Sequence, residues 1–150
     1  MDFFELLKQD HQKVSGIFEQ IEAAGNATRM RQQLFTQLKQ ELDLHANIEE
    51  SILYPMLKQA AETRDITTEA YEEHQEVKDL LAELEGTPIE DDEWESLLAE
   101  LKDNVEHHVD EEENEMFTKA REVLSDDQIS DISERMQAAK QQAPKSASAS

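Results

Sequence analysis

The sequence contains no cysteine, and it has only three glycines and three prolines among its 150 residues. Without cysteine, disulfides, thiolate metal sites, iron–sulfur clusters and a cysteine nucleophile are excluded. No run of alternating β-branched residues is present, so there is no candidate strand. No apolar run approaches the roughly 20 residues of a membrane span, and Met1 to Leu7 lack the features of a secretory signal. We therefore expect a soluble, cytoplasmic protein.

Basic residues are also scarce. The chain has 14 Lys and Arg against 36 Asp and Glu, which gives a net charge of −22. Binding to a phosphate backbone or to an anionic membrane needs clustered Lys and Arg. We therefore expect neither nucleic acid nor a membrane as a partner. The length predicts one domain, and the abundance of Leu, Ala, Glu, Gln and Lys favours helices.

Apolar residues recur at steps of three and four along five segments, which is the period of one helical face. We predict helices over about 3–24, 28–61, 65–85 (opened by Asp65 or Thr67), 91–124 and 126–140. Gly25 and the stretch Gly86-Thr87-Pro88 end the first and third of these, and a Ser125–Gln128 capping box begins the fifth. Because Pro55 has no backbone N–H, we expect it to kink or interrupt the second helix.

The first two helices repeat in the next two at a constant spacing of 63 residues. The related pairs include His11 and His74, Val14 and Val77, Leu38 and Leu101, His45 and His108, Glu49 and Glu112, and Glu50 and Glu113. Two repeated hairpins with short connections predict an all-α, up-and-down antiparallel four-helix bundle with a short C-terminal fifth helix. We expect one domain over residues 1–140 and a disordered tail over 141–150, which ends in small polar residues.

Six polar residues interrupt the apolar faces of the bundle helices: His11, His45, Glu49, His74, His108 and Glu112. In each repeat a histidine is followed four residues later by a glutamate, so both side chains project from one face. A lone histidine on an apolar face is usually a hydrogen-bonded core residue. Two buried carboxylates, however, are unfavourable without a partner and would repel each other. Six such positions at one spacing therefore predict metal ligands.

A pair of metal ions would satisfy all six groups, as in other bundle cores that hold dinuclear sites. The ligands are nitrogen and oxygen only, which suits iron or manganese, and zinc is also compatible. The simplest arrangement gives each metal two histidines, with Glu49 and Glu112 bridging both metals. Because iron accepts more ligands than these, open positions would remain, where dioxygen, peroxide or nitric oxide could bind.

This pattern resembles the haemerythrin-like, or HHE cation-binding, domain family. The likeness covers about residues 3–124 and rests on the six residues above, together with Leu53-Tyr54-Pro55 after the first glutamate pair. The resemblance implies a non-haem di-iron centre of two iron ions, with or without an oxo or hydroxo bridge. It also implies reversible dioxygen binding or, in bacterial members, oxygen, nitric oxide or peroxide chemistry, or iron handling.

The chain departs from the oxygen-carrying members at one histidine. Those members have a fifth histidine one turn along the third helix, where this sequence has Lys78 four residues after His74 and Ala70 four residues before it. One metal would then have a vacant ligand position. Water, Tyr54 or Tyr71 could fill that position, and the sequence does not distinguish among the three.

A second departure lies in the last carboxylate. In oxygen carriers this carboxylate is an aspartate, five residues after the ligand histidine of the same helix. Here it is Glu112, four residues after His108. Both departures disfavour stable oxygen carriage.

Three further residues flank the predicted ligands. His107 lies about 100° round the helix from His108, so we expect it to face solvent or a neighbouring helix. Glu50 and Glu113 each follow a predicted ligand. They are either part of a solvated flank or hydrogen-bond partners that orient a ligand histidine on an adjacent helix.

Two functional hypotheses follow. In the first, the chain is a di-iron protein that binds or reacts with a small oxidant (dioxygen, peroxide or nitric oxide), and an enzyme that reduces peroxide or oxygen falls within it. In the second, the chain binds, stores or senses iron or another divalent cation without redox turnover. A metal-free helical interaction module is disfavoured, because six polar groups would then be buried without purpose. The expected partner is a diatomic or peroxide ligand, and the expected state is a monomer or weak homodimer.

Overall fold

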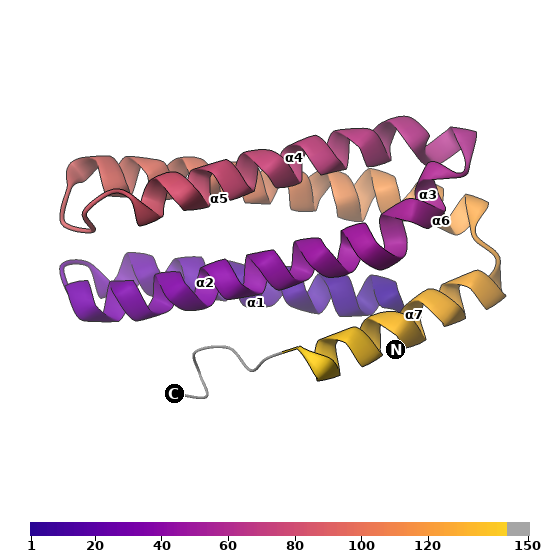
Figure 1. Cartoon of the computed structure of the whole chain (residues 1–150), viewed down its shortest axis with the longest axis horizontal. Coiled ribbons are helices and arrows are strands. Elements are labelled where there is room, and N and C mark those ends of the chain that lie inside the picture. Colours follow the sequence, from indigo (N-terminus) through magenta and orange to yellow (C-terminus); the bar gives the residue numbers. More distant parts are fainter. Residues whose placement is uncertain (144–150) are drawn as a thin grey trace.

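The computed structural model describes residues 1–143 as antiparallel helices, without a strand in that range (Figure 1). The elements are α1 (Phe3–Ala24), α2 (Thr28–Ile48), η1 (Glu49–Leu53), α3 (Tyr54–Lys58), α4 (Ala61–Glu85), α5 (Asp92–Glu111), η2 (Glu112–Met116), α6 (Phe117–Val123) and α7 (Asp126–Gln142). Here η1 and η2 are single π-helical turns. The predicted all-α bundle with a fifth helix is confirmed.

Four long rods form the bundle. The first and third are α1 and α4, the second is α2 with η1 and α3, and the fourth is α5 with η2 and α6. The fifth helix, α7, lies along the α1–α2 pair (Figure 1). Of the expected disordered tail, residues 141 and 142 complete α7, whereas residues 144–150 lie outside the described residues.

Local chemistry explains several helix ends. The Asp2 side chain accepts a hydrogen bond from the Glu5 N–H at 3.0 Å and caps α1. Gly25 ends α1 with φ of +54°, a conformation that favours glycine. The predicted capping box at α7 is present, because Ser125 and Gln128 each bond the other's backbone N–H.

The third rod begins earlier than predicted. It starts at Ala61, so Asp65 and Thr67 lie inside α4 and do not open it. The reason is a pair of buried threonines: the Thr63 hydroxyl donates to the Leu57 carbonyl, and the Thr67 hydroxyl donates to the Thr63 carbonyl at 2.6 Å. Thr67 is therefore bonded back into the preceding turn of its own helix.

The π turns lie at equivalent places in the two repeats. In the second rod, the π turn interrupts the α-helix just before Pro55, as expected. The fourth rod is interrupted in the same way, although the residue equivalent to Pro55 there is Thr118. A proline is therefore not required for the π turn at this place in the repeat. In each turn the backbone N–H after the turn donates to the glutamate carbonyl five residues earlier, from Tyr54 to Glu49 and from Phe117 to Glu112. Single π turns are frequent at functional sites.

The apolar core consists of two separate clusters. One lies at the end of the bundle covered by α3, α6 and α7 and includes Phe4, Leu53 and Phe117. The other lies toward the loops that join α1 to α2 and α4 to α5, and includes Leu38 and Trp94. Along the rods, five of the six predicted ligands fall between the residues of these two clusters, and Glu49 lies within the first cluster, between Ile48 and Ile52. The clusters thus hold the four rods on both sides of a polar layer.

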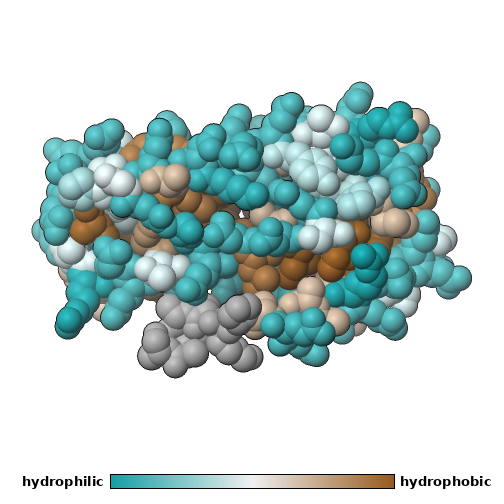
Figure 2. All heavy atoms as spheres, in the orientation of Figure 1, coloured by the Kyte–Doolittle hydropathy of each residue, from teal (hydrophilic) through white to brown (hydrophobic). Residues whose placement is uncertain are grey.

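Hydrophilic side chains cover most of the face in Figure 2, and apolar groups are visible along the seam between helices. This surface agrees with the net charge of −22. Within the residues that the structure describes, no helix is both long enough and apolar enough to cross a membrane.

Candidate metal centre

The six predicted residues meet in one polar layer at mid-bundle, and each of the four rods contributes to it. All six are buried, and the two glutamates are the most enclosed, with Glu49 0% and Glu112 1% exposed. The histidines are each exposed by 8% or less. Buried carboxylates of this kind need a positive partner.

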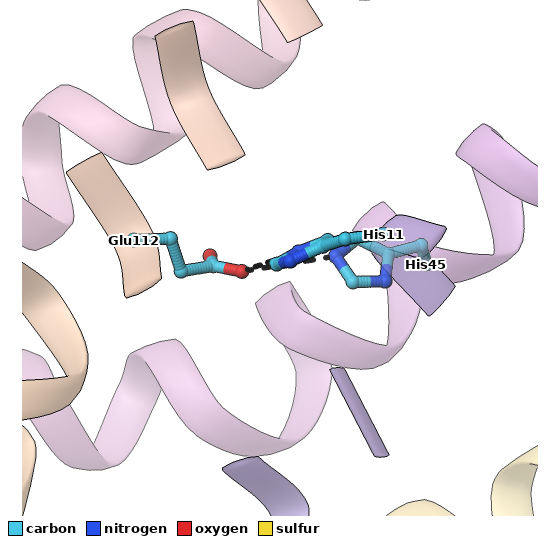
Figure 3. Close-up of side chains that lie close together, drawn as sticks. All are labelled: His11, His45 and Glu112. Atoms are coloured by element: carbon cyan, nitrogen blue, oxygen red, sulfur yellow. Dashed lines mark hydrogen bonds and ion pairs between the residues drawn. The ribbon is translucent and has the colours of Figure 1, made fainter. Parts of the chain in front are cut away.

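The layer divides into two groups whose potential ligand atoms lie within 4.8 Å of one another. His11 and His45 face Glu112, whereas His74 and His108 face Glu49. Figure 3 shows the first group, in which the three side chains point toward one another. Each group takes its two histidines from one hairpin and its glutamate from the other, so the centre connects the two halves of the bundle.

Glu112 faces both groups. Its Oε1 atom lies 3.0 Å from His11 Nε2 and 3.9 Å from His45 Nε2, and its Oε2 atom lies 3.5 Å from His108 Nε2. One carboxylate thus presents one oxygen to each pair of histidines, which is the geometry that a bridging carboxylate requires.

Glu49 also reaches both groups. Its Oε1 atom lies 3.1 Å from His45 Nε2, 3.1 Å from His74 Nε2 and 4.0 Å from His108 Nε2. The Nε2 atoms of all four histidines are therefore directed at the two carboxylates.

The other ring nitrogen of every histidine contacts a carboxylate on a neighbouring rod. The Nδ1–carboxylate pairs are His11–Glu113 at 2.6 Å, His45–Asp10 at 3.0 Å, His74–Glu50 at 2.7 Å and His108–Glu73 at 2.6 Å. Because a carboxylate accepts, each Nδ1–H donates outward, and whenever a ring is neutral its Nε2 lone pair faces the centre.

Two of these outer carboxylates, Glu50 and Glu113, were among the alternatives that the sequence left open, and the hydrogen-bonding alternative is confirmed. Asp10 and Glu73 were missed. A signal for them exists, because they immediately precede His11 and His74 and are themselves 63 residues apart. Each orients the histidine of the next rod and not its own neighbour in sequence.

Three buried polar atoms of the layer have no hydrogen-bond partner: His45 Nε2, His108 Nε2 and Glu49 Oε2. His45 Nε2 is 3.1 Å from Glu49 Oε1, but without hydrogen-bond geometry. A lone pair that faces a carboxylate oxygen in a buried layer is unfavourable unless a positive charge lies between them. A divalent metal ion is such a charge, and the donor set fits it.

The Tyr54 hydroxyl lies against this layer. It is within donating distance of Glu112 Oε2 at 3.0 Å and of Glu49 Oε1 at 3.2 Å, and it is 3.3 Å from His74 Nε2. In ideal α geometry a residue five positions after Glu49 would lie about 140° round the helix. The π turn brings Tyr54 back over Glu49. The equivalent residue in the second repeat, Phe117, has no hydroxyl, so the two halves differ here.

Tyr71, Lys78 and His107 are placed differently from Tyr54. Tyr71 is half-buried and packs edge-on against the Tyr54 ring at 5.2 Å between centroids. Lys78 Nζ lies 4.0 Å from Glu50. His107 is exposed, as expected, and contacts Glu111 at 2.8 Å on the surface.

Charges within the layer stabilise one another despite burial. Burial alone would lower the pKa of His45 and of His108, but the surrounding carboxylates outweigh it and raise both pKa values well above the ordinary range. Burial would raise the pKa of Glu49, but attraction to His45 brings it well below its usual value. Burial and repulsion from Glu49 would also raise the pKa of Glu112, but hydrogen bonds with His108 and His11 lower it to about 2.

A family model and a solved structure both match this chain. Residues 2–120 match the model described as Hemerythrin HHE cation binding domain. The crystal structure of a protein from Mycobacterium kansasii that contains this domain is similar, with a TM-score of 0.83 and 32% sequence identity. That similarity covers 94% of this chain and 86% of the other.

Curated relatives are similar over nearly the whole chain. A protein of Nostoc sp. named DNA nickase is 30% identical over 140 residues, which are 93% of this chain but 39% of that protein. This chain thus spans well under half of the Nostoc protein. An uncharacterised protein of Mycobacterium tuberculosis is 29% identical over 139 residues, which are 92% of this chain and 84% of that protein.

The pKa shifts predict how the stability of metal-free protein depends on pH. The raised pKa values of His45 and His108 contribute stability that is complete below about pH 6.5, the unfolded value, and is lost as pH rises through the folded values. The lowered pKa of Glu112 contributes stability that is complete above pH 4.5 and is lost as pH falls toward about 2. We expect the melting temperature of chelator-treated protein to be highest between these limits.

The measurement is thermal unfolding by circular dichroism from pH 2 to pH 9 in the presence of a chelator. In the Glu112→Gln protein, the fall in melting temperature at low pH should be smaller than in the wild type. A melting temperature that rises steadily from pH 6.5 to pH 9 would contradict the assignment.

Proposed function

The chain belongs to the haemerythrin HHE cation-binding domain family, and we propose that it binds two metal ions, both iron. The six ligands are His11, His45, Glu49, His74, His108 and Glu112. The observation that carries the proposal is the geometry of the polar layer. Four Nδ1–H groups are held outward by carboxylates, so the four Nε2 atoms converge on two buried glutamates. Two of these Nε2 atoms, of His45 and His108, and one oxygen of Glu49 lack a hydrogen-bond partner.

The donor types are compatible with iron. Imidazole and carboxylate ligands suit iron or manganese, and zinc is also compatible. Each metal would take two histidines, and Glu49 and Glu112 would bridge them, so each metal keeps positions free for a further ligand. When bound, two adjacent irons supply two one-electron centres for binding or reducing an oxidant.

A small apolar cavity beside the centre supports a diatomic or peroxide ligand. The cavity has a volume of about 40 Å³ and touches all four histidine rings, and its other walls include Val14, Val77, Val105 and Val109. A cavity needs roughly 10–15 Å³ to admit one water. This one therefore has room for a molecule of a few atoms, such as dioxygen, peroxide or nitric oxide.

Iron or divalent-cation binding without redox turnover is the second candidate function, as storage, buffering or sensing. The acidic surface favours it, because a net charge of −22 concentrates cations near the protein. Within the described residues, Glu73, His107 and Glu111 also form a third group of possible ligands, in which His107 is exposed and the two glutamates are half-buried. Reactivity toward an oxidant distinguishes the two functions.

The name of the Nostoc relative raises DNA as a further partner. Because this chain spans 39% of that protein, the nicking activity need not reside in the shared part. The net charge of −22 opposes contact with a phosphate backbone. We expect no mobility shift of duplex DNA at low salt in an electrophoretic assay. A shift that disappears as salt is raised would contradict this expectation.

We predict that protein purified in air contains about two irons per chain and has near-ultraviolet charge-transfer bands. Glu49→Gln and Glu112→Gln should each lower the metal content or make it heterogeneous, because each removes a negative charge between two cations. Glu115→Gln is a matched control, since Glu115 lies in the same π turn as Glu112 but is exposed. Metal analysis and absorption spectra provide the measurement.

Two outcomes would change the proposal. If both substitutions leave two metals per chain and an unchanged spectrum, the bridging role is wrong. If the purified protein is colourless and contains zinc, the function without redox turnover is favoured.

We propose that Tyr54, and not Tyr71, supplies the group at the vacant fifth-histidine position. Tyr54→Phe removes the hydroxyl that contacts both glutamates and should lower metal affinity about tenfold, the lower end of the range for groups that support a metal ligand. Tyr71→Phe should leave the affinity unchanged. Chelator competition with both variants tests this, and equal behaviour of the two would contradict the assignment.

A further inference from the structure

The C-terminal helix α7 reaches the metal centre through one ion pair. Lys140 Nζ donates to Asp10 Oδ1, while the other oxygen of Asp10 accepts from His45 Nδ1–H at 3.0 Å. The two oxygens of Asp10 therefore have different partners, one on α7 and one on a predicted ligand. The side chain of Asp10 is 14% exposed and that of Lys140 is 29% exposed, so both are partly shielded from water.

Packing holds α7 in register with α1. Ser133 is buried, and its hydroxyl oxygen accepts from the Phe3 backbone N–H at 2.7 Å, which joins α7 to the first turn of α1. Ile132 and Met136 are each 1% exposed and belong to the apolar cluster at this end of the bundle. Lys140 lies one turn after Met136, so the position of its ammonium group is set by a docked helix.

Asp10 differs from the other three outer carboxylates. It is the one aspartate among them, with a side chain one methylene shorter, and its 3.0 Å contact with the imidazole is longer than the 2.6–2.7 Å contacts of Glu50, Glu73 and Glu113. Lys78 Nζ is 4.0 Å from Glu50, beyond hydrogen-bond distance. Among the residues that the structure describes, Asp10 alone of the four receives a hydrogen bond from an ammonium group.

Within residues 1–143, no such helix covers the equivalent place in the other hairpin. Glu73 lies 63 residues after Asp10, and it borders an open surface hollow of about 250 Å³ that is lined by acidic side chains, Asn104 and His107. The two halves of the centre therefore match in their histidines and glutamates, and they differ in what lies on the outer side of the carboxylates that orient these histidines. Behind His45 there is a packed ammonium, and behind His108 there is an acidic, solvent-facing hollow.

We propose that Lys140 is a positioning residue for the metal centre, and that it acts through Asp10 on His45. This inference rests on the proposed function. The ammonium holds a short, partly exposed carboxylate in place, and that carboxylate holds the imidazole so that Nε2 faces the centre. Loss of the ammonium frees Asp10 to turn toward water, and His45 then loses its fixed orientation. The metal position next to His11 and His45 thus depends on the docking of α7, whereas the position next to His74 and His108 does not.

The test uses the full chain loaded with zinc, which is diamagnetic and permits nuclear magnetic resonance. Lys140→Met keeps the length and apolar part of the side chain but removes the charge. We expect one of the two zinc ions to pass to a chelator about tenfold faster than in the wild type, and the other to leave at the wild-type rate. Lys140→Arg should restore slow release, because it keeps a cationic donor.

Lys119→Met is the matched control. Lys119 pairs with Glu115 on the surface of the fourth rod and contacts none of the residues in the centre, so its loss should leave zinc release unchanged. The ring N–H protons supply an internal control. The His45 Nδ1 proton should exchange faster with water in the Lys140→Met protein, and the His108 Nδ1 proton should not.

A double-mutant cycle tests the route through Asp10. Asp10→Asn should itself speed release of the same zinc ion. If Lys140 acts through Asp10, adding Lys140→Met to Asp10→Asn should give no further change. Additive effects would show that Lys140 acts by another route, and this inference would then be wrong.

The remaining outcomes are equally decisive. If Lys140→Met releases both zinc ions faster and also lowers the melting temperature of metal-free protein, Lys140 only docks α7 and the inference is overturned. Unchanged release of both ions, in a protein that loads two, overturns the inference but leaves the proposed function intact. A wild-type chain that takes up neither zinc nor iron overturns the proposed function, and the inference with it.

Discussion

The structure depends on one electrostatic constraint: six polar groups, four imidazoles and two carboxylates, lie in the middle of an apolar bundle. Two apolar clusters on either side hold the four rods, so the layer cannot open to water without loss of core packing. Outer carboxylates hold every Nδ1–H, which leaves the inner lone pairs directed at Glu49 and Glu112. The layer therefore requires positive charge, either protons on the histidines or bound cations.

The repeat provides near-symmetry at the centre, and a few side chains break it. Each glutamate begins a π turn, but the residue that the turn brings over the layer is Tyr54 in one half and Phe117 in the other. Lys140 stands behind His45, whereas the place behind His108 is an open acidic hollow. Two metals held by such a layer would have the same histidine and glutamate ligands and different surroundings. Different surroundings give two metals different affinities and different access to a small ligand.

Most of the fold could be predicted from local patterns. The spacing of apolar residues predicted α1 over residues 3–24, because a helical face repeats within the helix itself. The predicted start of α4 was wrong, because the true start depends on a hydrogen bond from the Thr63 hydroxyl to the end of the preceding helix. The π turns were not predicted either. Their hydrogen bonds span five residues and have no distinct residue pattern, although Pro55 marks one of them.

The sequence by itself determined which six residues share the centre, because two His-x3-Glu pairs and two further histidines recur at a spacing of 63 on predicted apolar faces. Only the tertiary structure decided which residues support them. Asp10 and Glu73 bond histidines on other rods, and Lys140 is 130 residues from Asp10 in the chain. The position of Tyr54 over Glu49 likewise required the π turn. Helical periodicity acts along one element, whereas these contacts depend on how separate helices rotate and dock against one another.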